Sequence, residues 1–154
     1  MYHKILVPLD GSKPAEAVLP HACALAERFT AEIVLLRVPA DPADDLMFTG
    51  PKLVAATRGR TDALRREAID YLEQLAAELE DAGLCVATLV CDGPVVETIV
   101  GCAEKVRADL IVISSQGKGG LTGWPTGSVA YRLLHQARVP VLLVTAEPGE
   151  HQAV

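Results

Sequence analysis

The chain has 154 residues, half of which are hydrophobic, and it carries a formal net charge of −6. This length suits one domain, and the apolar fraction is large enough for a core that needs no disulfide or metal ion. An acidic chain without a basic stripe is poorly suited to nucleic acid or to an anionic membrane, so we expect neither as a partner.

The first predicted element is a buried strand over residues 4–9, a short apolar run that ends at a turn over residues 10–12. The serine of that turn suits a helix N-cap, and Pro14 fits the first turn of the helix that follows. Hydrophobic residues then recur at helical spacing over residues 15–29. We expect Pro20 to kink this helix, because proline removes a backbone donor.

A second strand is predicted over residues 32–38. The 22 residues of segment 39–60 include three prolines and two glycines, and we expect them to be irregular. Such long connections are usually functional or mobile. A helix over residues 61–82, ended by Gly83, and a third strand over residues 84–90 are predicted next.

A helix opened by Asp92, Gly93 and Pro94 is predicted next, and then a fourth strand over residues 109–113. A glycine-rich loop over residues 114–127, a short helix over residues 128–136 and a fifth strand over residues 139–145 follow. Apolar strands that alternate with amphipathic helices predict a single α/β domain with a doubly wound, five-stranded parallel sheet and helices on both faces. We place this domain at residues 1–146 and a flexible tail at residues 147–154.

No apolar run reaches the roughly 18 residues that span a bilayer. The first residues lead directly into the first strand and lack the features of a secretory signal. We therefore expect the protein to be cytoplasmic.

The four cysteines are Cys23, Cys85, Cys91 and Cys102. They form no CxxC pair and have no histidine at ligand spacing, so we expect no zinc site. All four lie in apolar stretches, which predicts buried thiols. Cys85 and Cys91 have the same parity on one predicted strand, but six residues of strand separate them by roughly 20 Å, too far to bridge.

In doubly wound folds the ligand binds beyond the carboxyl ends of the strands, where the strand order reverses. The loop over residues 114–128 lies at that edge and carries five glycines before Ser128, at the start of a helix. Glycines let backbone amides approach an anion, and a helix start adds the positive end of its dipole. Lys118 would add a positive charge. From these residues alone, a phosphate site and a plain flexible connection are equally open.

Asp10 follows the first predicted strand and Val38 closes the second, and both lie at the same edge. A carboxylate at Asp10 suits a ribose hydroxyl or a magnesium ion, although a simple turn former ahead of Gly11 is the alternative. The backbone of Val38 is placed to pair with an adenine edge, and an ordinary valine at a strand end is the alternative.

The chain resembles the universal stress protein family over nearly its whole length, from residues 5–12 (ILVPLDGS) through residues 140–144 (PVLLV). ATP-binding members of that family carry a loop of the form Gly-x2-Gly-x9-Gly-[Ser/Thr]. Gly117, Gly127 and Ser128 match its last three defined positions. Serine replaces the first glycine of the pattern at position 114, and Gln116 and Pro125 are further departures.

The resemblance implies that the chain binds ATP, with Mg²⁺ accompanying the nucleotide and Asp10 serving the ribose or the metal. Adenine would lie near the backbone of Pro8 and Val38, and the glycine loop with the helix that follows it would hold the phosphates. The expected nucleotide-binding residues are Pro8, Leu9, Asp10, Val38, Ile113, Ser114, Gly117, Lys118, Gly127, Ser128 and Val129.

The resemblance also implies the strand order 3-2-1-4-5 and a homodimer that pairs the fifth strand with its twin. A physical argument agrees, because Val141, Leu142, Leu143 and Val144 form an apolar edge strand without obvious gatekeeping charges, and such an edge needs cover. The alternative is cover by the tail or a loop of the same chain.

No catalytic constellation is evident: the four histidines are scattered, and no GxSxG elbow occurs. We expect slow ATP hydrolysis at most. Nucleotide binding would act as a switch that orders residues 39–60 and changes the affinity for a protein partner.

Three other functions share this fold class. A phosphoacceptor receiver domain would use Asp92, but it needs an acidic pair after the first strand and a lysine after the fifth. A flavodoxin-type carrier needs a hydroxyl-rich phosphate loop after the first strand. A dimerisation module that binds no nucleotide is the third, and the departures at Ser114, Gln116 and Pro125 leave it open.

Overall fold

The fold is a five-stranded sheet in which every pairing is parallel and the strand order is β3-β2-β1-β4-β5. The computed structural model describes residues 1–39, 51–115 and 128–145, with the backbone alone for residues 51–61 and 128. The strands are β1 (Lys4–Leu9), β2 (Glu32–Arg37), β3 (Val86–Val90), β4 (Leu110–Ser114) and β5 (Val141–Val144). The predicted fold class and strand order are confirmed, whereas the predicted tail lies outside the described residues.

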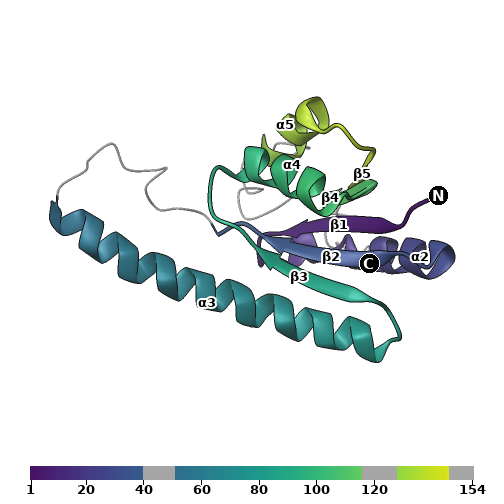
Figure 1. The fold of residues 1–154 in the computed structure, drawn as a ribbon, viewed down its shortest axis with the longest axis horizontal. Coiled ribbons are helices and arrows are strands. Elements are labelled where there is room, and N and C mark those ends of the chain that lie inside the picture. Colours follow the sequence, from purple (N-terminus) through teal and green to yellow (C-terminus); the bar gives the residue numbers. More distant parts are fainter. Residues whose placement is uncertain (40–50, 116–127, 146–154) are drawn as a thin grey trace, which may run out of the picture.

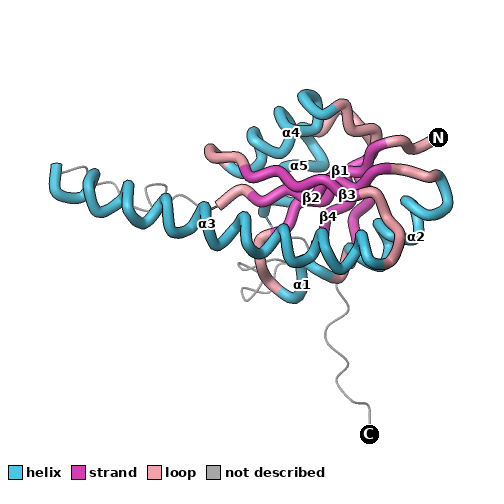
Figure 2. Tube along the Cα trace, turned by 60° about the horizontal axis from the view of Figure 1, so that its bottom comes forward, coloured by secondary structure: helices cyan, strands magenta, loops and turns pink. Residues whose placement is uncertain are grey.

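Helices cover both faces of the sheet (Figures 1 and 2). The helices α1 (Lys13–Glu16), α2 (Leu19–Phe29) and α3 (Pro51–Asp81) pack on one face, and α4 (Val95–Val106) and α5 (Ser128–Gln136) pack on the other. Within the described residues, no helix is long and apolar enough to cross a membrane.

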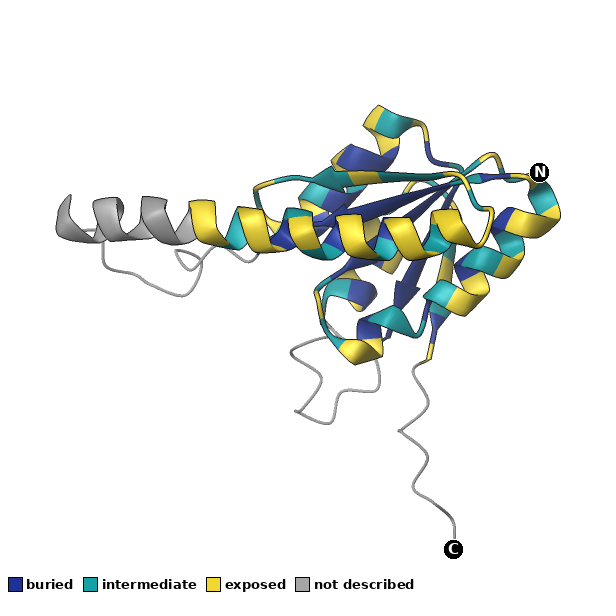
Figure 3. Ribbon diagram, turned by 90° about the horizontal axis from the view of Figure 1, so that it is seen from below, coloured by how far each residue is buried: buried dark blue, intermediate teal, exposed yellow. Residues whose placement is uncertain are grey.

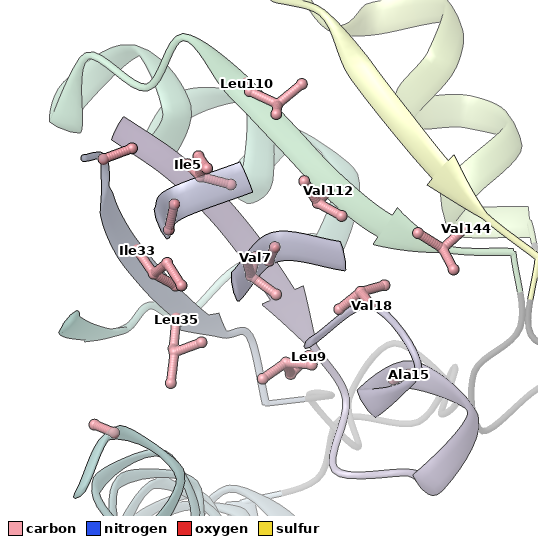
Figure 4. Close-up of a cluster of buried hydrophobic side chains, with 14 of the residues drawn as sticks. Ile5, Val7, Leu9, Ala15, Val18, Ile33, Leu35, Leu110, Val112 and Val144 are labelled. Atoms are coloured by element: carbon pink, nitrogen blue, oxygen red, sulfur yellow. The ribbon is translucent and has the colours of Figure 1, made fainter. Parts of the chain in front are cut away.

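Two hydrophobic cores lie on the two sides of the sheet, because successive residues of a strand point to opposite faces. The first core joins the sheet to α1, α2 and α3, and Figure 4 shows Ile5, Val7, Ile33 and Leu35 within it. The second core joins the sheet to α4 and α5 and contains Leu6, Val34, Ile99, Ile111 and Leu133. The central strands are thus apolar throughout, as their sequences predict.

The first predicted helix is split into two. Pro20 has no N–H to donate to the carbonyl four residues earlier, at Glu16, and its ring would clash with that carbonyl in a continuous helix. The helix therefore ends at Glu16 and a new one begins at Leu19. Ser12 caps the first piece, since its Oγ accepts a hydrogen bond from the Ala15 N–H at 3.3 Å.

The prediction that residues 51–60 are irregular is wrong, because α3 already begins at Pro51. Proline is well suited to a first helical position, and Gly59 inside the helix costs only about 1 kcal/mol relative to alanine. A helix of 31 residues is about 46 Å long, more than twice the length of β2. Its N-terminal turns therefore project past the carboxyl edge of the sheet (Figure 1). From residue 62 onward, exposed and buried positions alternate around α3 as it packs on the sheet (Figure 3).

The other predicted boundaries shift by one or two residues at strand ends, and α5 matches its prediction. The thiols are less uniformly buried than predicted. Cys102 is buried and Cys23 and Cys91 are half-buried, but Cys85 is exposed because it precedes the first paired residue of β3.

The turn after β1 depends on a glycine. Gly11 has φ +84°, a conformation that side chains with a Cβ rarely adopt. A Cβ at this position would also lie 2.5 Å from Nη1 of Arg37. The Arg37 side chain therefore occupies the space that any larger residue at position 11 would need.

We predict that Gly11→Ala lowers the free energy of unfolding by about 1–3 kcal/mol, through backbone strain and displacement of Arg37. Gly101→Ala is the matched control, since Gly101 lies within α4 and a Cβ there meets nothing within 4 Å. That variant should be stabilised by about 0.5–1 kcal/mol. Urea denaturation of both variants tests the pair, and equal effects of the two substitutions would contradict this explanation.

Candidate functional site

The carboxyl edge of the sheet is where the strand order reverses around β1. From β1 the chain passes through β2 to β3 on one side, and it returns to the other side at β4. β1 is registered with β2 from Lys4 to Leu9, but its registered pairing with β4 covers Ile5 and Leu6 alone. Pro8 has no N–H for a ladder hydrogen bond. Proline in this central strand thus accounts for the short pairing between β1 and β4. The carboxyl edge beyond it is the usual ligand position of doubly wound folds.

Asp10 lies directly after β1 at this edge and is half-buried. Its Oδ1 accepts a hydrogen bond from the Ser12 N–H at 2.9 Å and a second one from the Ser12 hydroxyl. The carboxylate is therefore held in a fixed orientation by the turn that follows. This arrangement supports the turn-forming role of Asp10, and it also fixes an anionic oxygen pair beside the switch point.

The other predicted residues at the strand ends lie at the same edge. Val38 follows β2 directly and is buried, and Ile113 and Ser114 close β4 and are buried as well. The Ser115 N–H donates to the carbonyl of Val144 at 2.8 Å, so the start of the loop after β4 is tied to β5. Parallel topology thus brings together the ends of β1, β2, β4 and β5, which are distant in sequence.

The phosphate-binding part of the prediction is described only in part. Gly117, Lys118 and Gly127 lie outside the described residues. The helix α5 begins at Ser128, as predicted, and Val129 packs against the second core. Since β4 ends at the carboxyl edge and α5 leads back to the start of β5, the N-terminus of α5 faces the carboxyl edge (Figure 1).

Arg37 is a charged residue of this edge that the sequence analysis did not single out. It is the last residue of β2, and it is buried with 9% of its surface exposed. Its Cζ lies 5.6 Å from the centre of the Tyr71 ring. Among the described residues, Nε and Nη1 have no hydrogen-bond partner. An arginine that ends an otherwise apolar strand is the sequence signal that could have identified it.

Tyr71 connects the long helix α3 to the first turn of the chain. Its hydroxyl donates a hydrogen bond to Oε1 of Glu16 at 2.7 Å. Burial, reinforced by this hydrogen bond and the charge of Glu16, raises the pKa of the Tyr71 hydroxyl above its ordinary value, so the group stays a donor well above neutral pH. The positive charge of Arg37 partly opposes this rise in the Tyr71 pKa, because the guanidinium lies near the ring.

A magnesium ion bound by the protein alone would need several oxygen ligands. Within the described residues, no group of three His, Cys, Asp or Glu side chains is placed to hold a metal. A single carboxylate, such as Asp10, fits Mg²⁺ only where phosphate oxygens and water complete the shell.

Comparison with known proteins agrees with this architecture. Residues 1–145 match the sequence model of the universal stress protein family. Universal stress protein MJ0531 of Methanocaldococcus jannaschii is 33% identical over 144 residues, which cover 94% of this chain and 82% of that protein. Universal stress protein MJ0577 of the same organism is 32% identical over 155 residues, with 94% and 95% covered.

Solved structures show the same fold. The structure of MJ0577 superposes with a TM-score of 0.84 and covers 96% of this chain and 99% of that one. The universal stress protein UspA of Lactobacillus plantarum, 26% identical, superposes with a TM-score of 0.83 and covers 93% and 97%. The match over almost the full length, in sequence and in strand order, establishes that this chain belongs to the universal stress protein family.

Proposed function

We propose that this chain is a cytoplasmic, homodimeric stress-response protein that binds ATP with Mg²⁺ at the carboxyl edge and acts as a nucleotide-dependent switch. The observation that carries the proposal is the convergence at one switch point of Pro8–Asp10, Val38, Ile113–Ser114 and the start of α5. ATP hydrolysis would be slow at most, and no residue is assigned a catalytic role.

Adenine nucleotides occur in other proteins of this fold. A universal stress protein was solved in complex with cAMP, at 23% identity and a TM-score of 0.60. A family member from Arabidopsis thaliana was solved with AMP bound, at 17% identity and a TM-score of 0.64. At these identities the likeness concerns the fold alone. The two complexes support an adenine nucleotide as the class of ligand, and calorimetry with ATP, ADP and AMP determines how many phosphates are preferred.

The charges at the edge favour a polyanion bound with a cation. The carboxylates of Glu16 and Asp10 raise the pKa of Tyr71 and the Arg37 guanidinium lowers it, so charges of both signs lie near this tyrosine. The dipole of α5 adds a partial positive charge at its N-terminus. Asp10 would then be a ligand of the Mg²⁺ that the phosphates carry, and Ser12 would orient the carboxylate.

The switch part of the proposal rests on the sequence. Of the connection expected to respond to the nucleotide, residues 40–50 lie outside the described residues, and residues 51–60 belong to α3. The four free thiols of the described chain suit a reducing compartment, which supports a cytoplasmic location.

We predict that Asp10→Asn weakens ATP–Mg²⁺ binding at least about tenfold, or about 1.4 kcal/mol, because the amide keeps the hydrogen bonds of Ser12 but loses the charge for the metal. Asp109→Asn is the matched control. Asp109 lies at the opposite edge of the sheet, where it accepts hydrogen bonds from the N–H groups of His3 and Lys4. Titration calorimetry of both variants and the unsubstituted chain is the measurement.

No heat for ATP, ADP or AMP with the unsubstituted chain, together with no nucleotide in the supernatant of denatured protein, would overturn the proposal. That outcome favours the dimerisation module that binds no nucleotide. Equal loss of binding in both variants would show that the effect of Asp10→Asn is a general loss of fold.

The proposed dimer uses β5, which is an outer strand of the sheet. Leu142 on β5 is 37% exposed, and Tyr131 and Leu134 on the adjacent helix α5 are exposed as well. Within the described residues, only Met1 adds another large exposed hydrophobic side chain. Leu142 shares the parity of Val144, on the α1–α3 face, whereas α5 covers the other face. Exposed hydrophobic side chains thus occur on both faces, and a second copy paired along β5 would cover Val141–Val144.

We predict that Leu142→Lys converts the dimer to a monomer, because a lysine on an edge strand opposes pairing with another strand. Thr88→Lys is the matched control, since Thr88 is exposed on β3, the other outer strand. Sedimentation velocity measures the mass of each variant. A dimer that survives Leu142→Lys, or that is lost in Thr88→Lys, would place the interface elsewhere.

A further inference from the structure

Two cysteine side chains that the sequence analysis treated as unrelated lie in direct contact. Cys91 follows β3, and Cys102 lies on α4. The Cys102 thiol points to the sulfur of Cys91, with 3.2 Å between the two Sγ atoms. Both cysteines are free. A disulfide bond is about 2.05 Å long, so the sulfurs need to approach by only about 1.2 Å to bond.

The backbone holds both residues of the pair in place. The Cys91 N–H donates to the carbonyl of Arg37 at 3.1 Å, which continues the β2–β3 ladder one residue past the end of β3. Cys102 belongs to the buried stripe of α4, with Ile99 about one turn and Val96 about two turns before it. The contact therefore joins a sheet position to a packed helix position, so folding itself brings the two sulfurs together.

The two thiols differ in access to solvent. Cys102 is buried with 6% of its surface exposed, whereas Cys91 is half-buried at the end of a strand. Burial and, to a smaller extent, the hydrogen bond with Cys91 raise the pKa of the Cys102 thiol to about 12. Cys102 is thus a neutral thiol at physiological pH, and an oxidant from solvent reaches Cys91 first.

We propose that Cys91 and Cys102 form a reversible redox site, in which a hydroperoxide oxidises Cys91 and Cys102 resolves it to an intramolecular disulfide. In the first step the Cys91 sulfur attacks the hydroperoxide. An S–O bond forms, the O–O bond breaks, and the alcohol, or water from hydrogen peroxide, leaves. Cys91 is then a sulfenic acid.

In the second step the Cys102 sulfur attacks the Cys91 sulfur. The S–S bond forms, the S–O bond breaks, and the leaving hydroxide takes the Cys102 proton as water. Two thiols lose two electrons and the hydroperoxide gains them. Two equivalents of a small thiol restore the reduced pair by thiol–disulfide exchange.

The other two cysteines are poorly placed to compete within one chain. Cys23 lies on α2 and packs against the first core, whereas Cys91 and Cys102 belong to the second core, so the sheet separates them. Cys85 is exposed at the far end of β3, roughly 20 Å from Cys91 along an extended chain. The structure therefore singles out one pair of the four thiols.

The experiment uses the chain of 154 residues with Cys85→Ser, so that the exposed thiol cannot form disulfides between chains. The folded protein is treated with hydrogen peroxide, denatured, and labelled with N-ethylmaleimide. Trypsin does not cut between Cys91 and Cys102, but Glu-C protease cuts after Glu97, the one glutamate between them. The two resulting peptides stay joined only by a disulfide.

We expect the labelled thiols to fall from three to one, that of Cys23, and the Cys91 and Cys102 peptides to appear as one linked species that dithiothreitol separates. The oxidised chain should melt higher, by on the order of 5 °C, because the bond restricts the unfolded chain. Retention of all three labelled thiols under oxidation, or a linked peptide that contains Cys23, would overturn the proposal.

Two further variants test the order of the steps. In Cys102→Ala the sulfenic acid on Cys91 has no resolving thiol, so dimedone should trap it. In Cys91→Ala the buried Cys102 should remain unmodified for the same exposure. Faster dimedone labelling of Cys102 than of Cys91 would reverse the assigned roles. The site does not depend on nucleotide binding, so either proposal can fail while the other stands.

Discussion

The arrangement of this protein depends on the burial of β1 on both of its faces, between β2 and β4. Residues from Ile5 to Leu9 are all buried; Ile5, Val7 and Leu9 belong to the first core and Leu6 to the second. A strand in this position requires helices on both sides of the sheet, and right-handed crossovers to neighbours on either side then reverse the strand order at its carboxyl end. The candidate ligand site is therefore a consequence of how the core is built.

A buried charge gives this edge its local structure. Arg37 ends β2 and lies against Gly11 and over Tyr71, while Tyr71 reaches Glu16 in α1. The guanidinium thus connects the turn after β1, the first helix and the long helix α3. Burial of a charge costs free energy unless charged or polar groups surround it. The Tyr71 ring, 5.6 Å from Cζ of Arg37, offsets part of that cost and ties the ligand edge to α3.

The same elements show where local sequence signals succeed and where they fail. Pro20 signalled a disturbance of the first helix correctly, but whether the helix bends or breaks depends on how its two halves pack. Pro51 and Gly59 suggested a loop, although both residues are compatible with a helix, and α3 includes them. Cys85 lay in an apolar stretch, yet it precedes the paired part of β3 and is exposed. Each error arose because a local pattern was used for a property that neighbouring elements control.

The sequence by itself determined the class of fold, the five strands, the start of α5 and the strand-end positions of Asp10, Val38 and Ser114. These follow from apolar runs, helical periodicity and turn residues, which act over a few neighbouring residues. Only the tertiary structure decided that Arg37 faces Gly11 and Tyr71 and that Cys91 touches Cys102. Contacts of this kind depend on strand order, register and helix rotation, and many distant residues fix these jointly, so no local pattern encodes them.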